Sequence, residues 1–273
     1  MHWLMVHFPP SIILVNDQPG NGTADIRLRL IMAQWPEVKH EFMVVKPSRV
    51  WKELAEPDAQ ACANLAIVTQ EREKQFYMTV TNLGPPVGVV ARPEVLKTMA
   101  KNARGEILPG ALFDRADLTG IINPGRSYGA LIDSLLSHRN PQAKVAEVIP
   151  WNGGSNILEM ILAGRADYTL DHERAMNYLM DTVPRLKNAK LASTYLAGGR
   201  MNQISIVCPR NAWGYATIRK IDSIVTALAR NPEFQQDNGI WISAKERAYM
   251  KPAMDEFFKA RALPTPPDRY PPP

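Results

Sequence analysis

Residues 162–173 read LAGRADYTLDHE, and this stretch contains the end of a helix, a short strand and the start of a second helix. The residues before Gly164 have helical spacing, and glycine commonly follows the last turn of a helix. Residues 167–170 are predicted to form a short strand. Asp171 then occupies the N-cap position of a helix that is expected to run through Leu179. A strand enclosed by two helices is typical of α/β proteins.

The same alternation continues on both sides of this stretch. Predicted strands occupy residues 3–8, 41–45, 63–68, 76–80, 87–91, 119–123, 145–149, 191–196 and 203–208. Three further helices are expected, with Thr23, Ser48 and Ser155 as their N-cap residues. Two more helices are expected to face the core through Leu131, Ile132, Leu135 and Leu136, and through Ile218, Ile221, Val225 and Leu228.

This pattern predicts mainly parallel sheets that are covered by helices on both faces. The alternation runs through two cycles, with breaks near residues 90 and 200, which indicates two lobes. The tail PTPPDRYPPP, residues 264–273, is expected to be disordered or loosely laid on the surface because it is so rich in proline.

Composition excludes two classes of partner. The chain has 273 residues, 45% of them hydrophobic, and its net charge of +5 comes from basic residues that are scattered among acids. No basic block with interleaved aromatic residues is present, so no nucleic acid is expected as a partner. No apolar run approaches the roughly 20 residues that a membrane span needs.

The two cysteines leave the compartment open. Cys62 and Cys208 are either two buried free thiols or one disulfide, and a disulfide would indicate an oxidising compartment. Met1 leads directly into strand-like sequence without a signal peptide. The chain is therefore either cytoplasmic or the mature form of an exported protein behind a new Met.

Motifs for catalysis or cofactor binding are missing from the sequence. It contains no H-E-x-x-H, no G-x-S-x-G, no phosphate-binding G-x-x-x-x-G-K-[ST] and no G-x-G-x-x-G after a strand. The five histidines do not have the spacing of metal ligands. We therefore predict no catalytic residues, no metal and no cofactor.

Three strings carry a resemblance to a known family. Thr69-x-x-Arg72 with Phe76-Tyr77 after it resembles the T-x-x-R … F-S region of bacterial periplasmic solute-binding proteins of family 3. Residues 162–173 resemble the L-x-x-G-R-x-D-x-x-x-x-D stretch of the same proteins, and Phe8-Pro9-Pro10 resembles their aromatic-x-Pro after the first strand. Residues 125–129, GRSYG, are most similar to a largely uncharacterised branch of this family.

The resemblance implies an architecture, a location and a role. The fold would be the two-lobed type 2 periplasmic-binding-protein fold, with lobe I formed by residues 1–90 and 200–273 and lobe II by residues 91–199. Two crossing strands, near residues 87–91 and 196–203, would connect lobes that close on a ligand. The protein would be a periplasmic monomer that captures a small polar ligand for an ABC transporter permease in the inner membrane.

The resemblance also assigns a carboxylate-binding group. Arg72 matches the family arginine that holds the ligand's α-carboxylate, a task that suits the paired N–H donors of a guanidinium. The alternative for Arg72 is a surface ion pair with Glu71 or Glu73, and both acids are expected to lie in water together with Lys74. Thr69 would donate its hydroxyl to the same carboxylate.

Aromatic residues are expected around the ligand side chain. Phe8 matches an aromatic residue that covers it, and Trp51 would form the other wall, although both residues suit a core position equally well. Leu65 and Ile67 stand where amino-acid binders often have hydroxyl residues, so a standard amino acid is in doubt as the ligand.

Asp171 matches the acid that takes the ligand's ammonium group, in addition to its predicted N-cap role. Gly125, Arg126, Ser127 and Tyr128 lie between a strand and a helix, where backbone N–H groups suit an anion. Arg126 departs from the family pattern of small hydroxyl residues. Its side chain either meets an extra acidic group on the ligand or points to solvent.

The leading hypothesis is thus a non-catalytic solute-binding protein for an amino-acid-like or carboxylate-bearing ligand. One rival is an enzyme on the same scaffold, similar to cyclohexadienyl dehydratase, with Glu173 or Asp171 as its general base. A second rival is a sensor or interaction module in which Arg72 is paired internally with a Glu. The sequence does not identify the ligand or its stereochemistry.

Overall fold

Contacts divide the chain into two units in the computed structural model, which describes residues 1–236 and 240–273. Unit 1 consists of Met1–Gly84, Asn202–Ile240 and Arg247–Pro273, and unit 2 consists of Pro85–Met201 and Trp241–Glu246. Each unit is built around a mixed sheet. The small second segment of unit 2 has no counterpart in the predicted division into residues 1–90, 91–199 and 200–273.

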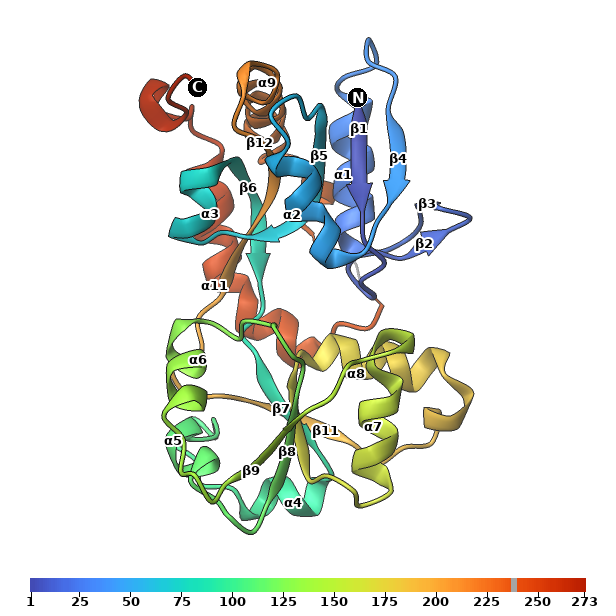
Figure 1. The fold of residues 1–273 in the computed structure, drawn as a ribbon, viewed down its shortest axis with the longest axis vertical. Coiled ribbons are helices and arrows are strands. Elements are labelled where there is room, and N and C mark those ends of the chain that lie inside the picture. Colours follow the sequence, from blue (N-terminus) through green and yellow to red (C-terminus); the bar gives the residue numbers. More distant parts are fainter. Residues whose placement is uncertain (237–239) are drawn as a thin grey trace. The chain divides into compact units, whose positions relative to one another are not determined.

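The sheet of unit 1 has the strand order β4-β1-β5-β12-β6 (Figure 1). Its strands are β1 (His2–Met5), β4 (Glu41–Val44), β5 (Ala61–Ile67), β6 (Phe76–Gly84) and β12 (Asn202–Pro209). β1 is parallel to both β4 and β5, whereas β12 is antiparallel to β5 and β6. The sheet therefore combines parallel and antiparallel pairs, because the chain returns from unit 2 through β12. A short hairpin, β2 (Leu14–Val15) and β3 (Gln18–Pro19), precedes the first helix.

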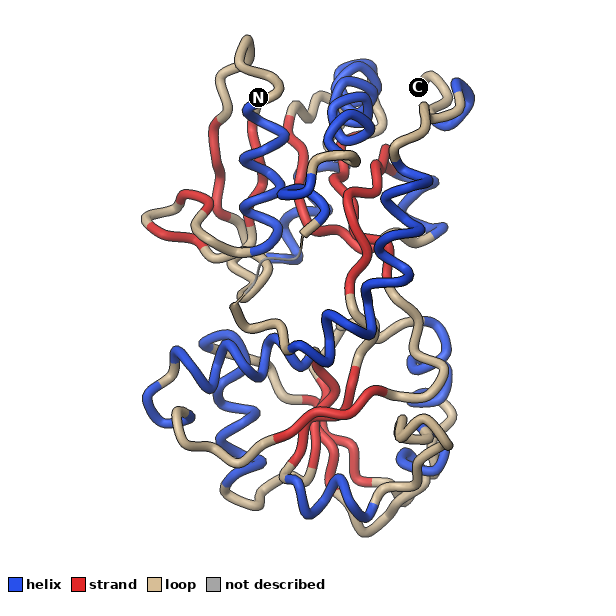
Figure 2. Tube along the Cα trace, turned by 180° about the vertical axis from the view of Figure 1, so that it is seen from behind, coloured by secondary structure: helices blue, strands red, loops and turns tan. Residues whose placement is uncertain are grey.

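Helices cover both faces of this sheet. Those of unit 1 are α1 (Thr23–Ala33), α2 (Pro47–Ala55), α3 (Gln70–Gln75), α9 (Ala212–Leu228), α10 (Pro232–Gln235) and, in its later part, α11 (Ala244–Arg261). Figure 1 shows α2 in front of the sheet, and Figure 2, seen from behind, shows α1 in front. On the α2 side, Val50 and Leu54 pack against Leu4 and Val207. The four apolar residues predicted for the face of α9 are all buried, which confirms the helical pattern in that segment.

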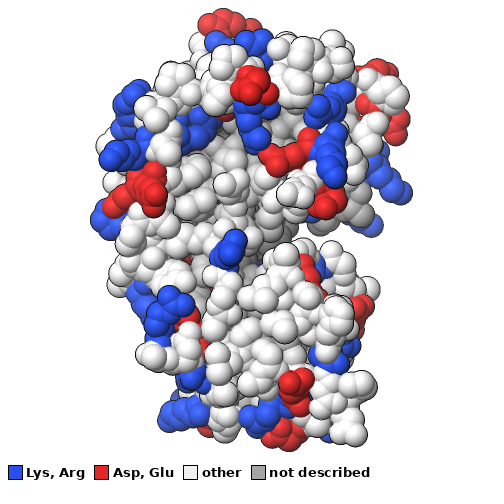
Figure 3. Space-filling view, turned by 90° about the vertical axis from the view of Figure 1, so that its left-hand side faces the viewer, with Lys and Arg blue, Asp and Glu red and all other residues white. Residues whose placement is uncertain are grey.

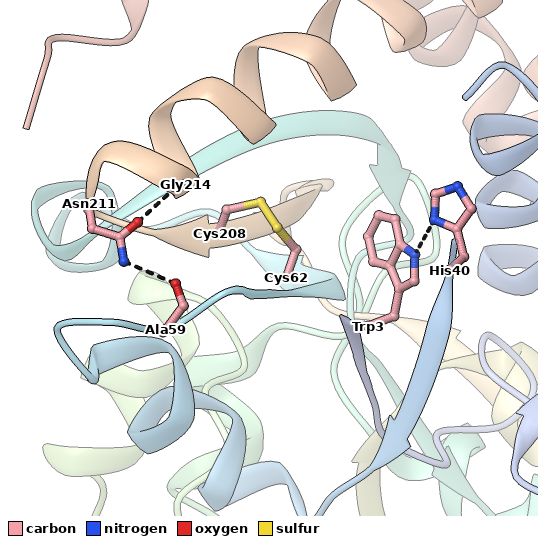
Figure 4. The surroundings of a disulfide bond; sticks show 7 residues. All are labelled: Trp3, His40, Ala59, Cys62, Cys208, Asn211 and Gly214. Carbon is pink, nitrogen blue, oxygen red and sulfur yellow. Dashed lines mark hydrogen bonds between the residues drawn. A yellow bond between two sulfur atoms is a disulfide. The ribbon is translucent and has the colours of Figure 1, made fainter. Parts of the chain in front are cut away.

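A disulfide joins two neighbouring strands of unit 1. Cys62 on β5 is bonded to Cys208 on β12, with the two Cα atoms 4.4 Å apart (Figure 4). Nearby, the Asn211 side chain caps α9 by accepting from the Gly214 N–H and donates to the Ala59 carbonyl. Of the two alternatives for the cysteines, the structure therefore contains the disulfide.

The proline-rich tail is anchored rather than loose, so the prediction for residues 264–273 is wrong. Tyr270 is only 7% exposed, and its hydroxyl donates to Asp222 at 3.0 Å. The same Asp222 oxygen accepts hydrogen bonds from Thr79 and Arg261. Burial, followed by the charge of Asp222, raises the pKa of Tyr270. Tyr270 anchors the tail despite its high proline content, because the ring is buried in the core and the hydroxyl has a hydrogen-bond partner there.

The sheet of unit 2 has the order β11-β7-β10-β8-β9. Its strands are β7 (Gly88–Ala91), β8 (Thr119–Ile122), β9 (Lys144–Glu147), β10 (Tyr168–Asp171) and β11 (Ala192–Tyr195). β8 is parallel to β9 and β10, whereas β7 is antiparallel to β10 and β11. The parallel pair matters for the site, because it places the carboxyl ends of β8 and β10 at the same edge.

Two hydrophobic layers enclose the sheet of unit 2. Its helices are α4 (Pro93–Thr98), α5 (Pro109–Phe113), α6 (Ala130–Ser137), α7 (Ser155–Leu162) and α8 (Glu173–Thr182). Figure 1 shows α5 and α6 on one side of the sheet and α7 and α8 on the other. Val89 packs in the first layer and Val90 in the second, as the alternation of a strand requires. Ile132 and Leu136 of α6 are buried as predicted, but Leu131 is 48% exposed because it lies on the outer face of this helix.

Residues 241–246 attach to α8 within unit 2. The Trp241 ring packs edge-on against Tyr178 at 4.8 Å, and its Nε1 donates to Asp181 at 3.0 Å. Arg174 forms an ion pair with Glu246 in which both side chains are buried. This contact explains why so short a segment groups with unit 2, although it begins the helix that ends in unit 1.

The predicted N-caps are each displaced by one or two residues from the observed ones. α1 is capped by Gly22, whose N–H donates to Asp25, and α2 by Lys46, with Pro47 at its first position. α7 begins at Ser155 itself, after Gly154 in the left-handed conformation. β10 extends through Asp171, which moves the cap of α8 to His172. The N-cap predictions for Thr23, Ser48, Ser155 and Asp171 are therefore wrong.

Acidic and basic side chains are intermingled on the face of the molecule drawn in Figure 3. Among the described residues, the helices are too short or too polar for any of them to cross a bilayer.

Candidate functional site

Arg72 of unit 1 is a half-buried cation that has no acidic partner among the described residues. Its guanidinium lies 4.2 Å from the centre of the Trp51 ring and donates to the Ile67 carbonyl at 2.7 Å. Within the described residues it forms no ion pair, and its pairing with Glu71 or Glu73 is not observed. Burial lowers the pKa of Arg72 below its ordinary value, although the group stays charged at neutral pH. A partly desolvated charge without a counterion is costly in a protein that has no use for it.

Local structure fixes the position of Arg72. Thr69 is the N-cap of α3, and its hydroxyl oxygen accepts from the Arg72 N–H at 3.3 Å. α3 follows β5 directly, so the guanidinium reaches back to the last carbonyl of that strand. Trp51 belongs to α2, and its ring packs in a tilted orientation against the Phe76 ring, with the two ring centres 5.4 Å apart. Trp51 therefore belongs to the edge of the core and also supports the cation.

The neighbours of Arg72 on α3 behave differently from one another. Glu71 and Lys74 are exposed, as predicted. Glu73 is not simply solvated, because its carboxylate pairs with Arg269 of the tail at 2.6 Å. The anchored tail thus holds α3 from outside, which the sequence pattern of α3 does not reveal.

Phe8 follows β1 and is 45% exposed, a large fraction for a phenylalanine in a structured loop. Its backbone forms a bridge with Ile12, so the ring is carried on an ordered turn. Leu65 has a positive φ of 67°, which marks an irregularity in β5 near its bulged pairing with β12.

In unit 2, the loop between β8 and α6 is held by its own side chains. Tyr128 is buried in the core, and its hydroxyl accepts from the Asn123 N–H at 2.8 Å. Asp133 accepts from the Tyr128 N–H and from the Ser127 hydroxyl. Gly125 has a φ of +71°, which a residue with a side chain adopts only with strain.

Arg126 projects from this loop towards Asp171 and not to solvent. Its guanidinium donates to Asp171 Oδ1 at 3.0 Å and lies 5.2 Å from the centre of the Tyr128 ring. The side chain is 19% exposed. The two residues meet because β8 and β10 are parallel neighbours whose carboxyl ends lie at one edge.

The electrostatics around Asp171 keep it ionised. Burial by itself would raise the pKa of the Asp171 carboxyl, but Arg126 and the hydrogen bond from the His172 N–H hold it below its ordinary value. Burial, and then the charge of Arg126, lowers the pKa of His172 to about 4. Nδ1 of the neutral His172 ring lies 3.4 Å from the Pro86 carbonyl oxygen. This contact is a hydrogen bond when Nδ1 carries the ring proton.

The predicted site residues therefore form two groups, one in each unit. In unit 1, Arg72 contacts both Thr69 and Trp51, and Phe8 lies on a separate loop. In unit 2, Arg126 contacts Asp171 and Tyr128, whereas Ser127 serves the loop itself. Sequence reasoning missed Asp133 and His172. His172 stands directly after the predicted Asp171, whereas Asp133 is five residues after Tyr128 and has no comparable sequence signal.

A surface pocket of about 360 Å³ in unit 1 lies apart from the stacked face of Arg72. The tail forms part of it, and its walls include Tyr77, Arg210 and Arg269. Arg210 already donates to the Glu73 carbonyl, and Arg269 is paired with the Glu73 carboxylate. We interpret this pocket as a gap left between the anchored tail and the rest of unit 1, and not as a ligand site. In the described part of the chain, no group of three acidic, His or Cys side chains is arranged to hold a metal ion.

Comparisons with known proteins define the fold. No family model matches the chain, and no curated protein matches its sequence. The probable amino-acid ABC transporter extracellular-binding protein ytmK from Bacillus subtilis is similar in structure, with a TM-score of 0.66 at 14% identity over 89% of this chain and 97% of that one. An amino acid ABC transporter substrate-binding protein from Streptococcus pneumoniae, bound to L-arginine, gives a TM-score of 0.61 at 16% identity over 93% and 92% of the two chains.

A third similar structure has another context. The periplasmic domain of BvgS from B. pertussis gives a TM-score of 0.61 at 16% identity, over 94% of this chain and 45% of that one. Together these structures establish that the chain has the two-lobed type 2 periplasmic-binding-protein fold. The fold predicted from the three sequence strings is therefore confirmed.

Proposed function

We propose that this protein is a solute-binding protein that captures a small carboxylate-bearing solute and delivers it to an ABC transporter. The fold supports this role, since similar structures belong to substrate-binding proteins of amino-acid ABC transporters. In unit 1, the group proposed to hold the carboxylate of the solute is Arg72.

The observation that carries the proposal is the state of Arg72. Its guanidinium is half-buried, oriented by Trp51 and the Ile67 carbonyl, and has no acidic partner within the described residues. A carboxylate ligand would supply the missing counterion through charge-assisted hydrogen bonds. Thr69 and Phe8 would complete this half of the site, the first by its hydroxyl and the second by its exposed ring.

The disulfide supports a periplasmic location. Disulfides persist in exported proteins and are rare in the reducing cytoplasm. Cys62 and Cys208 are both fully buried and bonded in the core of unit 1. The partner we propose is therefore an inner-membrane permease, met by a monomeric protein in the periplasm.

The enzyme alternative has less support. It requires a carboxylate general base whose pKa lies near the working pH. The pKa of Asp171 is shifted away from the working pH, because Arg126 holds it below the ordinary value. That leaves Glu173, at the first turn of α8, as the only base predicted from the sequence. We expect a prephenate-like acid to remain unchanged after long incubation with the protein.

A sensor role is the second candidate, because the periplasmic domain of BvgS shares the fold. The sensor hypothesis predicted an internal Arg72–Glu pair that makes external anions unnecessary. The described structure has no such pair, which favours ligand capture.

Titration calorimetry against a panel of amino acids and organic acids tests the proposal. We expect at least one compound to bind with a dissociation constant near 1 μM, which corresponds to about −8 kcal/mol. Such binding should require a free carboxylate, so the methyl ester of the best compound should bind far more weakly. A panel in which neither class binds would refute ligand capture.

A further inference from the structure

The Arg126–Asp171 pair narrows the class of solute. This inference rests on the proposed function, because it concerns the part of the solute that faces unit 2. In the family resemblance, Asp171 was assigned to the ligand's ammonium group. The structure instead gives that carboxylate a cation of the protein's own, the Arg126 guanidinium at 3.0 Å.

The pair is rigid on both sides. Arg126 lies over the Tyr128 ring, and Tyr128 is locked in the core by the Asn123 N–H and by Asp133. Asp171 ends β10, and its Oδ1 also accepts from the His172 N–H at 2.8 Å. A ligand would therefore meet the pair already formed and would have to break both contacts on Oδ1 to use that oxygen.

Oδ2 of Asp171 remains without a hydrogen bond from the described residues and is the atom that an ammonium group would seek. An ammonium at Oδ2 would also lie within a few ångströms of the Arg126 guanidinium. Repulsion from that cation opposes the attraction to Asp171, and the two effects are of similar size at similar distances. The pair thus has no net charge with which to select a cation.

Arg126 has donors left for an oxygen acceptor. Only one of its terminal nitrogens donates within the described residues, and that bond goes to Asp171. The neighbouring His172 is neutral above its lowered pKa of about 4, so it neither adds nor removes charge at neutral pH.

We propose that the solute is an organic acid without an amino group, and that it presents a carboxylate or another oxygen acceptor to Arg126 of unit 2. An ammonium group beside this loop would face the Arg126 guanidinium, whereas an oxygen acceptor there would use the donors that Arg126 has left.

Matched pairs of probes that differ by one amino group test this proposal. Succinate is compared with L-aspartate, and glutarate with L-glutamate, by titration calorimetry on the full chain at neutral pH. We expect the member without the amino group to bind at least about tenfold more tightly, a difference of about 1.4 kcal/mol. Equal or tighter binding of the amino acid would overturn the proposal.

An Arg126→Gln variant gives a second readout. It removes the guanidinium and leaves Asp171 available, so the preference within each pair should shift towards the amino acid by about tenfold or more. An unshifted preference in a folded variant, judged by an unchanged circular dichroism spectrum, would contradict the assignment. Failure of the proposed function has a different signature, which is that neither member of any pair binds to the wild-type protein.

Discussion

Two arginines on aromatic rings, one in each unit, differ in a single respect. Arg72 lies over Trp51 and Arg126 over Tyr128, and each is partly buried. Arg126 has an acidic partner in Asp171, whereas Arg72 has none in the described part of the chain. The comparison shows that the counterion, and not the arginine or its stacking, distinguishes a guanidinium whose charge is unpaired among the described residues from one whose charge is already paired.

Replacing Arg72 by Met should have the largest effect, and it should appear in binding. Loss of two charge-assisted hydrogen bonds, at about 1.5–3 kcal/mol each, predicts at least about 100-fold weaker binding of the solute in calorimetry. The melting temperature should stay the same or rise, because a half-buried charge without a partner is removed.

Lys74→Met is the matched control, since Lys74 is an exposed cation on the same helix. It should bind the solute like the wild type. Equal weakening in both variants would show that general charge, and not the guanidinium of Arg72, attracts the anion.

Replacing Arg126 by Met should lower the stability of the protein, in addition to the change in ligand preference expected on loss of this guanidinium. Asp171 would lose its cation while it remains 25% exposed, which should lower the free energy of unfolding by about 1–3 kcal/mol in urea denaturation. Arg139→Met is the control, because Arg139 is also partly buried but donates only to the Leu136 carbonyl. A loss no larger than that of the control would remove the distinction between the two arginines.

The pH dependence of stability should reflect the surroundings of Arg126. The pKa of His172 is about 4 in the folded chain, below its ordinary value near 6.5, so the unfolded chain binds the proton first as the pH falls. The free energy of unfolding should therefore fall between pH 6.5 and 4, with a slope of at most about 1.4 kcal/mol per pH unit from this group.

A His172→Asn variant should flatten that slope, and Arg126→Met should reduce it without abolishing it, because burial is the larger cause of the shift. Thermal unfolding measured across this range provides the test. An unchanged slope in the His172 variant would assign the pH dependence to other groups.

The smallest effect is expected for the ring beneath Arg72. Trp51→Leu keeps an apolar contact with Phe76 but removes the cation–π interaction, which is worth about 0.5–1 kcal/mol and predicts roughly 3-fold weaker binding. Trp35→Leu is the control, since Trp35 is a partly buried tryptophan of unit 1 that packs against His40. Loss of affinity in the control alone would separate Trp51 from the site.

The sequence predicted what depends on local pattern and on resemblance. The helix–strand alternation located most elements, and the buried face of α9 followed from its spacing. Arg72 could be proposed as a site residue because Thr69 and Arg72 belong to one short string around a strand end. Those features are set by residues that are close together in the chain.

Features that depend on distant partners were not predictable in the same way. Arg126 and Asp171 are 45 residues apart, and only the parallel pairing of β8 and β10 brings them together. Tyr270 and Asp222 are 48 residues apart, and the proline-rich composition around Tyr270 indicated the opposite of its buried state. The pattern of one segment does not show which polar group from a distant part of the chain will pair with it in the fold.

The anchored tail has a practical consequence for anyone who shortens this chain. Removing residues 264–273 as a supposedly dispensable end would take the Tyr270 ring out of the core and leave Asp222 with water in its place. It would also release Glu73, and with it the outer side of α3. The last residues of the protein thus brace the helix on which Arg72 is mounted, so a truncated version would report on a weakened binder instead of the native one.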